Sequence, residues 1–199
     1  VVEEATSLIP KAYFGGANAL LNNKQFAEAV ELYKKVIELE PENANAILRL
    51  GMALNGAGNT EEAISTFLLA KDKGKEKDAV KQLCNIYTKQ AAASLKGKKF
   101  AEAVEAAGKI IDLNPENAQA YQIAGQASQL AGKNADAISY FEKYLELAPT
   151  AKNAGQIAYT VGALYQSAKN NAKAKEYYQK AVTDPKYGAE AAKLLNSLK

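Results

Sequence analysis

Histidine and cysteine, two residue types that often carry catalysis or bind metals, are absent from this 199-residue sequence and present only once, respectively. Histidine is missing, so the chain lacks the usual general base near neutral pH. Neither a Ser-His-Asp nor a Cys-His arrangement can be built. The single cysteine, Cys84, excludes an intramolecular disulfide and a cysteine cluster for a metal ion. We therefore expect no enzymatic activity, no cofactor and no metal site.

Strong net charge and long apolar runs are lacking as well. Lys and Arg total 25 against 22 Asp and Glu, and this net charge of +3 does not indicate a polyanionic partner for the whole molecule. Only Arg49 is an arginine, the residue best suited to bidentate recognition of phosphate or carboxylate. No apolar run approaches the roughly 18 residues that suggest a membrane span. The chain begins at Val1 without a methionine, which indicates a removed leader or an upstream continuation.

One segment is present twice and organises the rest of the chain. Residues 26–43 read FAEAVELYKKVIELEPEN and residues 100–117 read FAEAVEAAGKIIDLNPEN, an offset of 74. Each has the apolar spacing of an amphipathic helix followed by a proline. Within each copy a second helix pair follows after 34 residues, as the step from Ala29 to Ala63 shows. No stretch alternates with a period of two, so we expect no strands.

The same patterning predicts helices along the whole chain. Pro10 is expected to start or kink the first helix, Thr60 to cap the fourth, and residues 71–78 (KDKGKEKD) to form a charged connector. The predicted helices cover residues 1–21, 25–40, 45–55, 60–71, 78–95, 100–113, 118–130, 135–147, 153–168, 173–183 and 188–198.

A 34-residue helix–turn–helix unit with small residues at fixed sites resembles the tetratricopeptide repeat. The family has a small residue on the first helix, and an alanine and then an aromatic residue on the second. The small site is filled by Ala17, Gly51, Ala91, Gly125 and Gly162. The alanine site is filled by Ala29, Ala63, Ala103, Ala137 and Ala174, and the aromatic site by Tyr33, Phe67, Phe141 and Tyr178, with Ala107 in the third unit.

The resemblance implies an all-α fold, a right-handed α-solenoid (superhelix) of antiparallel helix pairs that forms a single array over residues 1–199. Because repeats bury their faces only against neighbours, the ends of such an array need sealing. Leu194, Leu195 and Leu198 suit a capping helix, whereas residues 1–9 look like the continuation of an upstream element. The five repeats are expected at about 10–43, 44–77, 78–117, 118–151 and 152–186, with the cap at 188–198.

In the resembled family, outward residues of each first helix line a concave groove. Most of these sites carry amides here, and amides can both donate to and accept from a peptide backbone. Equally, Asn and Gln are acceptable exposed helix residues. The family's clamp for acidic tails is not expected, because Phe14 and Arg49 stand where it has lysine and asparagine. The candidate groove residues are Asn18, Asn45, Met52, Asn55, Asn85, Gln119, Gln122, Gln126, Gln129, Gln156, Tyr159 and Gln166.

We therefore expect a non-enzymatic protein–protein interaction scaffold that binds a peptide or protein segment in the groove. One alternative is a positioning or oligomerisation module of a longer polypeptide whose activity lies elsewhere. Another is weak binding of nucleic acid or an acidic surface by residues 71–99, where nine lysines accompany three acids. A solubilising connector explains these lysines more simply, so nucleic acid is the less favoured partner. Lys- and Asn-rich turns resemble those of exported bacterial repeat proteins, which favours the periplasm or cell envelope over the cytoplasm and leaves the oligomeric state open.

Overall fold

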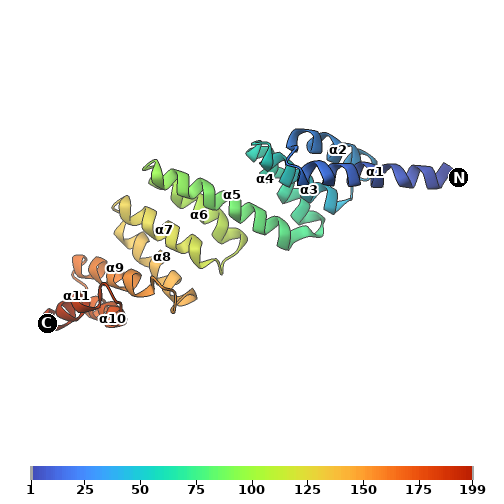
Figure 1. The fold of residues 1–199 in the computed structure, drawn as a ribbon. Coiled ribbons are helices and arrows are strands. Elements are labelled where there is room, and N and C mark those ends of the chain that lie inside the picture. Colours follow the sequence, from blue (N-terminus) through green and yellow to red (C-terminus); the bar gives the residue numbers. More distant parts are fainter. Residues whose placement is uncertain (1, 199) are drawn as a thin grey trace. The chain divides into compact units, whose positions relative to one another are not determined.

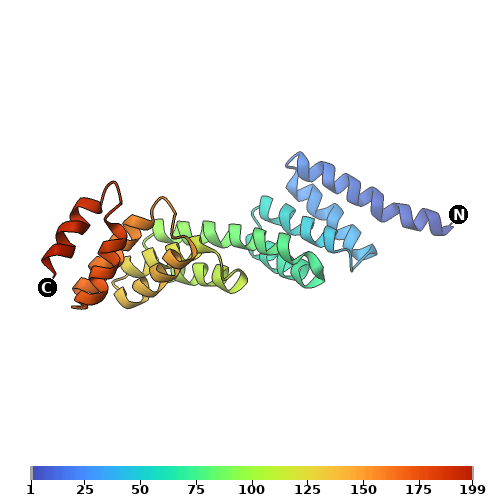
Figure 2. The same ribbon diagram turned by 90° about the horizontal axis from the view of Figure 1, so that it is seen from below.

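The computed structural model describes residues 2–198, and their side chains from residue 8 onwards (Figures 1 and 2). All regular structure in this part of the chain is helical, as the sequence predicts. The helices form an all-α solenoid that divides into two compact units, residues 1–86 and 87–199. No helix in the described part is both long and apolar enough to span a membrane.

In the first unit, the first four helices pack on their neighbours in chain order. Helix α2 lies between α1 and α3, and α3 packs on α4. Ala29, Tyr33, Ala63 and Phe67 are fully buried, so the predicted small and aromatic positions form this core. The helices are α1 (Val2–Asn22), α2 (Phe26–Leu39), α3 (Ala44–Gly56), α4 (Thr60–Ala70) and α5 (Glu76–Lys96), the last continuing into the second unit.

Two local predictions in the first unit are wrong, and one of the two alternatives for Pro10 is excluded. Pro10 does not start α1, because that helix already runs from Val2 and contains Pro10, which is buried. Thr60 is the first helical residue and not the cap, a position that Asn59 takes. The connector is shorter than predicted, because Gly74 adopts a φ of 91° and the chain re-enters a helix at Glu76. The expected upstream element at residues 1–9 falls mostly outside the described side chains.

The second unit follows the same plan and ends in an additional helix. Neighbouring helices from α6 to α11 pack on each other in chain order. Leu194, Leu195 and Leu198 at the end of α11 lie partly buried against the core around Val161 and Tyr178. The helices are α6 (Phe100–Leu113), α7 (Ala118–Leu130), α8 (Asn134–Leu147), α9 (Ala154–Ser167), α10 (Asn171–Ala181) and α11 (Gly188–Ser197).

Close contact between a glycine and a ring fixes the spacing inside three helix pairs. A Cβ on Gly125 would lie 2.6 Å from the ring of Phe141, a distance that real side chains do not tolerate. The small residue on the first helix is therefore required by the aromatic residue on the second. The same approach is found for Gly51 against Phe67 and for Gly162 against Tyr178, each with 2.7 Å to the ring.

Candidate functional site

Uncharged polar side chains from α7 and α9 surround a hollow of about 180 Å³ in the second unit. The glutamines on α7 are spaced by three and four residues, so they share one face of that helix. Phe141 and Ile157 are buried and supply the apolar part of the lining. The full lining is Gln122, Gln126 and Gln129 from α7, Phe141 from α8, Asn153 just before α9, and Gln156, Ile157 and Thr160 from α9.

The glutamine amides around this hollow are not used inside the protein. Gln126, Gln129 and Gln156 are exposed and Gln122 is half-buried. Within the described part of the chain, no side-chain hydrogen bond engages any of these four amides. Each amide offers two N–H donors and an acceptor oxygen. The hollow therefore presents several donors and acceptors to whatever enters it.

Two further polar groups of the lining are partly engaged inside the protein. The Asn153 Oδ1 atom accepts one hydrogen bond from the Tyr144 hydroxyl, which leaves the N–H₂ donors and a second lone pair of that oxygen. The Thr160 hydroxyl donates to the Gln156 carbonyl oxygen at 3.0 Å, so its oxygen remains an acceptor. Both residues lie on the α9 side of the hollow, seven positions apart with Gln156 between them. The Asn153 end of this wall can therefore donate and accept, whereas the Thr160 hydroxyl can accept.

Asn18 and Gln166, two of the sequence-predicted groove residues, are bound internally. The Tyr33 hydroxyl donates to Asn18 Oδ1 at 2.7 Å, and the Tyr178 hydroxyl donates to Gln166 Oε1 at 2.6 Å. A buried tyrosine needs a partner for its hydroxyl, which a phenylalanine at the same site does not. The aromatic site carries tyrosine in the helix pairs of Asn18 and Gln166. The sequence therefore already contained a signal that an amide of the first helix is used internally there. Burial raises the pKa of both tyrosines.

The other predicted residues lie outside the hollow. Tyr159 stacks on Tyr187 with ring centroids 5.1 Å apart, so it forms part of the contact with α11. Gln119 is exposed on α7 but does not line the hollow. Asn45, Met52 and Asn85 are exposed and Asn55 is half-buried, all in the first unit.

Phe14 and Arg49, which stand where the family's clamp for acidic tails has lysine and asparagine, contact each other. The Arg49 guanidinium lies 5.9 Å from the centre of the Phe14 ring, which in turn meets Tyr33 edge to face. A guanidinium held over a ring in this way gains a cation–π interaction. Arg49 is therefore engaged with a neighbouring helix of its own unit.

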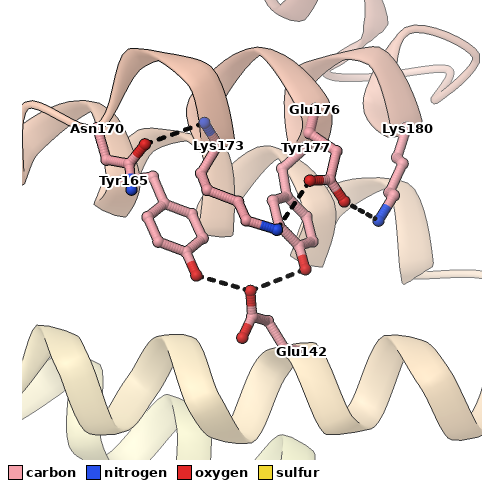
Figure 3. Close-up of polar contacts among 7 residues, drawn as sticks. All are labelled: Glu142, Tyr165, Asn170, Lys173, Glu176, Tyr177 and Lys180. Carbon is pink, nitrogen blue, oxygen red and sulfur yellow. Dashed lines mark hydrogen bonds and ion pairs between the residues drawn. The ribbon is translucent and has the colours of Figure 1, made fainter.

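A second polar cluster in the second unit was missed by the sequence reasoning (Figure 3). One carboxylate oxygen of Glu142 on α8 accepts hydrogen bonds from Tyr165 on α9 at 2.7 Å and from Tyr177 on α10 at 2.9 Å. Burial and the carboxylate raise the pKa of Tyr165 to about 12, and that of Tyr177 also rises. Lys173 and Lys180 both pair with Glu176 at 3.0 Å.

A hollow of about 920 Å³ lies beside this cluster. Its rim includes Pro149 to Lys152, which belong to the connection that precedes the fifth predicted repeat. The three extra residues between the fourth and fifth repeats were the signal in the sequence that could have indicated this hollow. Acidic and basic side chains occur in equal number around it, so its charge favours no ligand of either sign. The charged lining is Glu142, Glu146 and Asp184 with Lys152, Lys173 and Lys180. Among the described residues, no three acidic or cysteine side chains lie close enough to hold a metal ion.

Three models of the tetratricopeptide repeat match the chain, at residues 20–86, 88–152 and 155–183. The chain belongs to the tetratricopeptide repeat family. The repeat is in general a non-enzymatic fold that mediates protein–protein interaction. The chain forms a scaffold of this class. No curated protein sequence matches the chain.

Solved structures of repeat proteins resemble the chain over nearly its whole length. MamA is 21% identical with a TM-score of 0.50, over 92% of this chain and 94% of that one. The tetratricopeptide domain of P58(IPK) is 13% identical with a TM-score of 0.51, over 95% of this chain and 64% of that one. YrrB, a tetratricopeptide repeat protein with an unusual peptide-binding site, is 23% identical with a TM-score of 0.48, over 91% and 90%. At these identities the first two show a shared fold.

Proposed function

We propose that this tetratricopeptide repeat protein is a scaffold whose second unit binds an extended segment of a partner protein across α7 and α9. The observation that carries the proposal is the set of four unengaged glutamine amides around one hollow. An extended peptide presents backbone donors and acceptors along its length, and amides can pair with both. The buried Phe141 and Ile157 would add apolar contact beneath the segment.

The size of the hollow favours part of a polymer over a free small molecule. Pockets that enclose small molecules usually measure about 300–1,000 Å³. The volume here is about 180 Å³, room for one side chain of a ligand whose remainder lies outside. A peptide that crosses the two helices and inserts one side chain fits this shape.

The alternative functions stay predictions, with less support from the structure. In the lysine-rich segment, Lys73 pairs with Glu42 at 2.5 Å and Lys99 pairs with Glu102 at 3.1 Å, which reduces the local excess of positive charge. Lys98 occupies the left-handed turn position, with a φ of 58°, as Lys24 and Lys169 do in other pairs. Turn formation therefore explains part of this lysine content. A positioning role within a longer polypeptide has no specific observation in its favour.

Peptide display with matched glutamine variants tests the proposal. A random library of extended peptides is selected on the wild-type chain, and the affinity of an enriched peptide is measured by fluorescence anisotropy. Gln126→Ala with Gln129→Ala is expected to weaken binding by about tenfold or more, since neutral hydrogen bonds contribute about 1 kcal/mol each. Gln90→Ala with Gln179→Ala, two exposed glutamines of the same unit outside the hollow, should leave the affinity unchanged.

Circular dichroism of both double variants first establishes that they remain helical. Failure to enrich any peptide above the background of the bare support would contradict the proposal. Equal affinity of the enriched peptide for the two double variants would also contradict it, because binding would then lie elsewhere on the chain.

A further inference from the structure

A smaller hollow beside Ser128, about 140 Å³ in volume, lies apart from the one between α7 and α9. We propose that the hollow beside Ser128 binds one tyrosine side chain of a partner protein. The inference depends on the volume of the hollow, its largely apolar lining and its one buried hydroxyl. The lining is Phe100, Ala101 and Val104 from α6, Ser128 from α7, Ala131 and Lys133 from the turn that follows, and Asp136 from α8.

Two differences between the sequence copies explain why the second unit has room at this place. Ser128 and Leu130 stand where the first copy has Leu54 and Gly56. In the first unit Leu54 is fully buried, and a Cβ on Gly56 would lie 2.5 Å from the Phe26 ring. Because Leu130 has a Cβ, the equivalent phenylalanine of the second unit cannot approach the backbone as closely. The second unit thus has a smaller side chain and a ring that cannot take the same place.

The volume and the lining suit one neutral ring. An apolar cavity of about 150 Å³ can hold a benzene molecule, whereas pockets for whole small molecules usually measure about 300–1,000 Å³. Phe100 and Val104 are half-buried hydrocarbon side chains, and the two alanines of the lining add methyl groups. Lys133 and Asp136 are exposed and opposite in sign, so they favour neither a cation nor an anion.

The Ser128 hydroxyl distinguishes between neutral rings. Ser128 is 1% exposed, whereas the other lining residues are half-buried or exposed, so it forms the deep end of the hollow. Its Oγ atom has no hydrogen-bond partner in the described structure. Rotation about the Cα–Cβ bond can therefore turn this hydroxyl towards an occupant. An unpaired buried hydroxyl is costly, so an occupant that pairs with it gains more than one that only fills space.

Tyrosine carries its polar atom at the end that reaches Ser128. A partner's side chain enters with its tip first, and the tip of tyrosine is a hydroxyl that both donates and accepts. Phenylalanine has the same ring without that atom, and the hydroxyls of serine and threonine lie too close to the backbone to reach the deep end. A charged side chain would lose water in a largely apolar lining. Tyrosine alone combines the ring with a neutral polar tip.

An NMR titration of the whole chain with p-cresol and toluene, which represent the side chains of tyrosine and phenylalanine, tests the hollow. In the wild type, p-cresol should shift the amide signals of Val104, Ser128 and Ala131 and bind at least threefold more tightly than toluene, because one further hydrogen bond forms. Ser128→Leu restores the residue of the first copy and should weaken p-cresol binding at least tenfold. Ser128→Ala should retain toluene binding and lose the preference for p-cresol.

Ser139→Ala, a matched change at an exposed serine of α8, should bind both probes as the wild type does. Unaltered p-cresol binding by Ser128→Leu would overturn the site, and an unaltered preference in Ser128→Ala would overturn the role of the hydroxyl. The urea midpoint of Ser128→Leu shows whether it is folded, and Ser128→Ala gives an independent readout if it is not.

The source of the phenol ring requires one more probe. N-acetyl-tyrosinamide carries the ring on a peptide backbone, and it should bind with the same dependence on Ser128 as p-cresol. Binding of p-cresol without binding of N-acetyl-tyrosinamide would overturn the assignment to a partner's side chain. The glutamine variants of the peptide experiment leave this hollow intact, so failure of the proposed function and failure of the present inference are distinguishable.

Discussion

Ser128 carries a buried hydroxyl with no hydrogen-bond partner in the described structure. At the 74-residue offset that relates the two copies of the sequence, its counterpart is Leu54, which is fully buried. A hollow of about 140 Å³, lined in part by Phe100 and Val104, lies beside Ser128. The second copy therefore has less apolar volume at this position than the first, and it carries a polar group without a partner among the described residues.

Removing that hydroxyl should stabilise the protein. Ser128→Ala is expected to raise the free energy of unfolding by about 1 kcal/mol, because an unpaired buried hydroxyl carries a desolvation penalty of about that size. Ser128→Leu should gain more by filling part of the hollow, at about 0.8 kcal/mol per buried methylene. The midpoint of urea unfolding, followed by circular dichroism, measures both changes.

Ser139 provides the control for this pair. It is exposed on α8 and donates to the Ala135 carbonyl oxygen at 3.2 Å, so Ser139→Ala should change the stability by less than about 0.5 kcal/mol. A lower midpoint for Ser128→Ala would show that the hydroxyl has a partner in solution and would contradict the reasoning.

At the scale of helix pairs, the second helix decides whether an amide on the first helix is free. Gln129 and Gln166 occupy equivalent positions, 37 residues apart, as do Phe141 and Tyr178. Tyr178 has a hydroxyl that donates to Gln166, whereas Phe141 has none and leaves Gln129 unengaged. The presence of the tyrosine hydroxyl thus determines whether the amide is bound inside the protein, as in Gln166, or available to a ligand, as in Gln129.

Exchanging the two aromatic residues tests this rule. Phe141→Tyr should bring a hydroxyl to Gln129 and weaken binding of an enriched peptide several-fold, since that amide would then be occupied. Tyr178→Phe should free Gln166 and lower the stability by about 1 kcal/mol, with peptide affinity unchanged. Anisotropy and thermal unfolding of both variants give the two quantities. Unaltered affinity for Phe141→Tyr, with an intact fold, would show that Gln129 takes no part in binding.

At the scale of the whole molecule, stability is the sum of contacts between neighbouring helices. The Glu142 carboxylate adds a polar contact to this sum in the second unit, because it joins α8 to both α9 and α10 through Tyr165 and Tyr177. The connection between α8 and α9, residues 148–153, is two residues longer than the connections between α2 and α3 and between α6 and α7, and it borders a hollow. The tyrosine–carboxylate contact bridges the helices on one side of that opening.

This contact predicts an alkaline loss of stability. The folded state raises the pKa of Tyr165 from about 10 to about 12, so it holds that proton more tightly than the unfolded chain. The resulting stabilisation is complete below pH 10 and is lost as the pH rises towards 12. Glu142→Gln removes the negative charge that helps to raise the pKa, and should flatten the fall in the urea midpoint across this range.

Asp136→Asn serves as the matched control for the alkaline experiment. Asp136 is exposed on the same helix, and among the described residues its side chain has no hydrogen bond to either tyrosine and no ion pair with a lysine. This variant should keep the wild-type pH profile between pH 10 and 12. Identical profiles for wild type and Glu142→Gln would contradict the role assigned to the carboxylate.

Much of the fold could be predicted from the sequence, because helix periodicity and repeat spacing are properties of neighbouring residues. In the described part of the chain, every α-helix begins and ends within two residues of its predicted bounds. The sequence did not show that α1 continues through Pro10 or that Gly74 ends the connector. Those outcomes depend on the burial of Pro10 and on the backbone angle of Gly74, which a local sequence pattern does not reveal. The small residue opposite each aromatic ring was predicted from the repeat and is explained by the ring distance.

The sequence by itself determined that the chain is a set of helix pairs and which faces of the helices are buried. It also determined that glutamines form a stripe on α7, since a helical face is set by spacing alone. Only the tertiary structure decided which amides remain free, where Asn153 and Thr160 turn their donors and acceptors, and that one hollow collects them. Those outcomes depend on hydrogen bonds between residues on different helices, and the positions of these helices are set by side-chain packing over the whole unit.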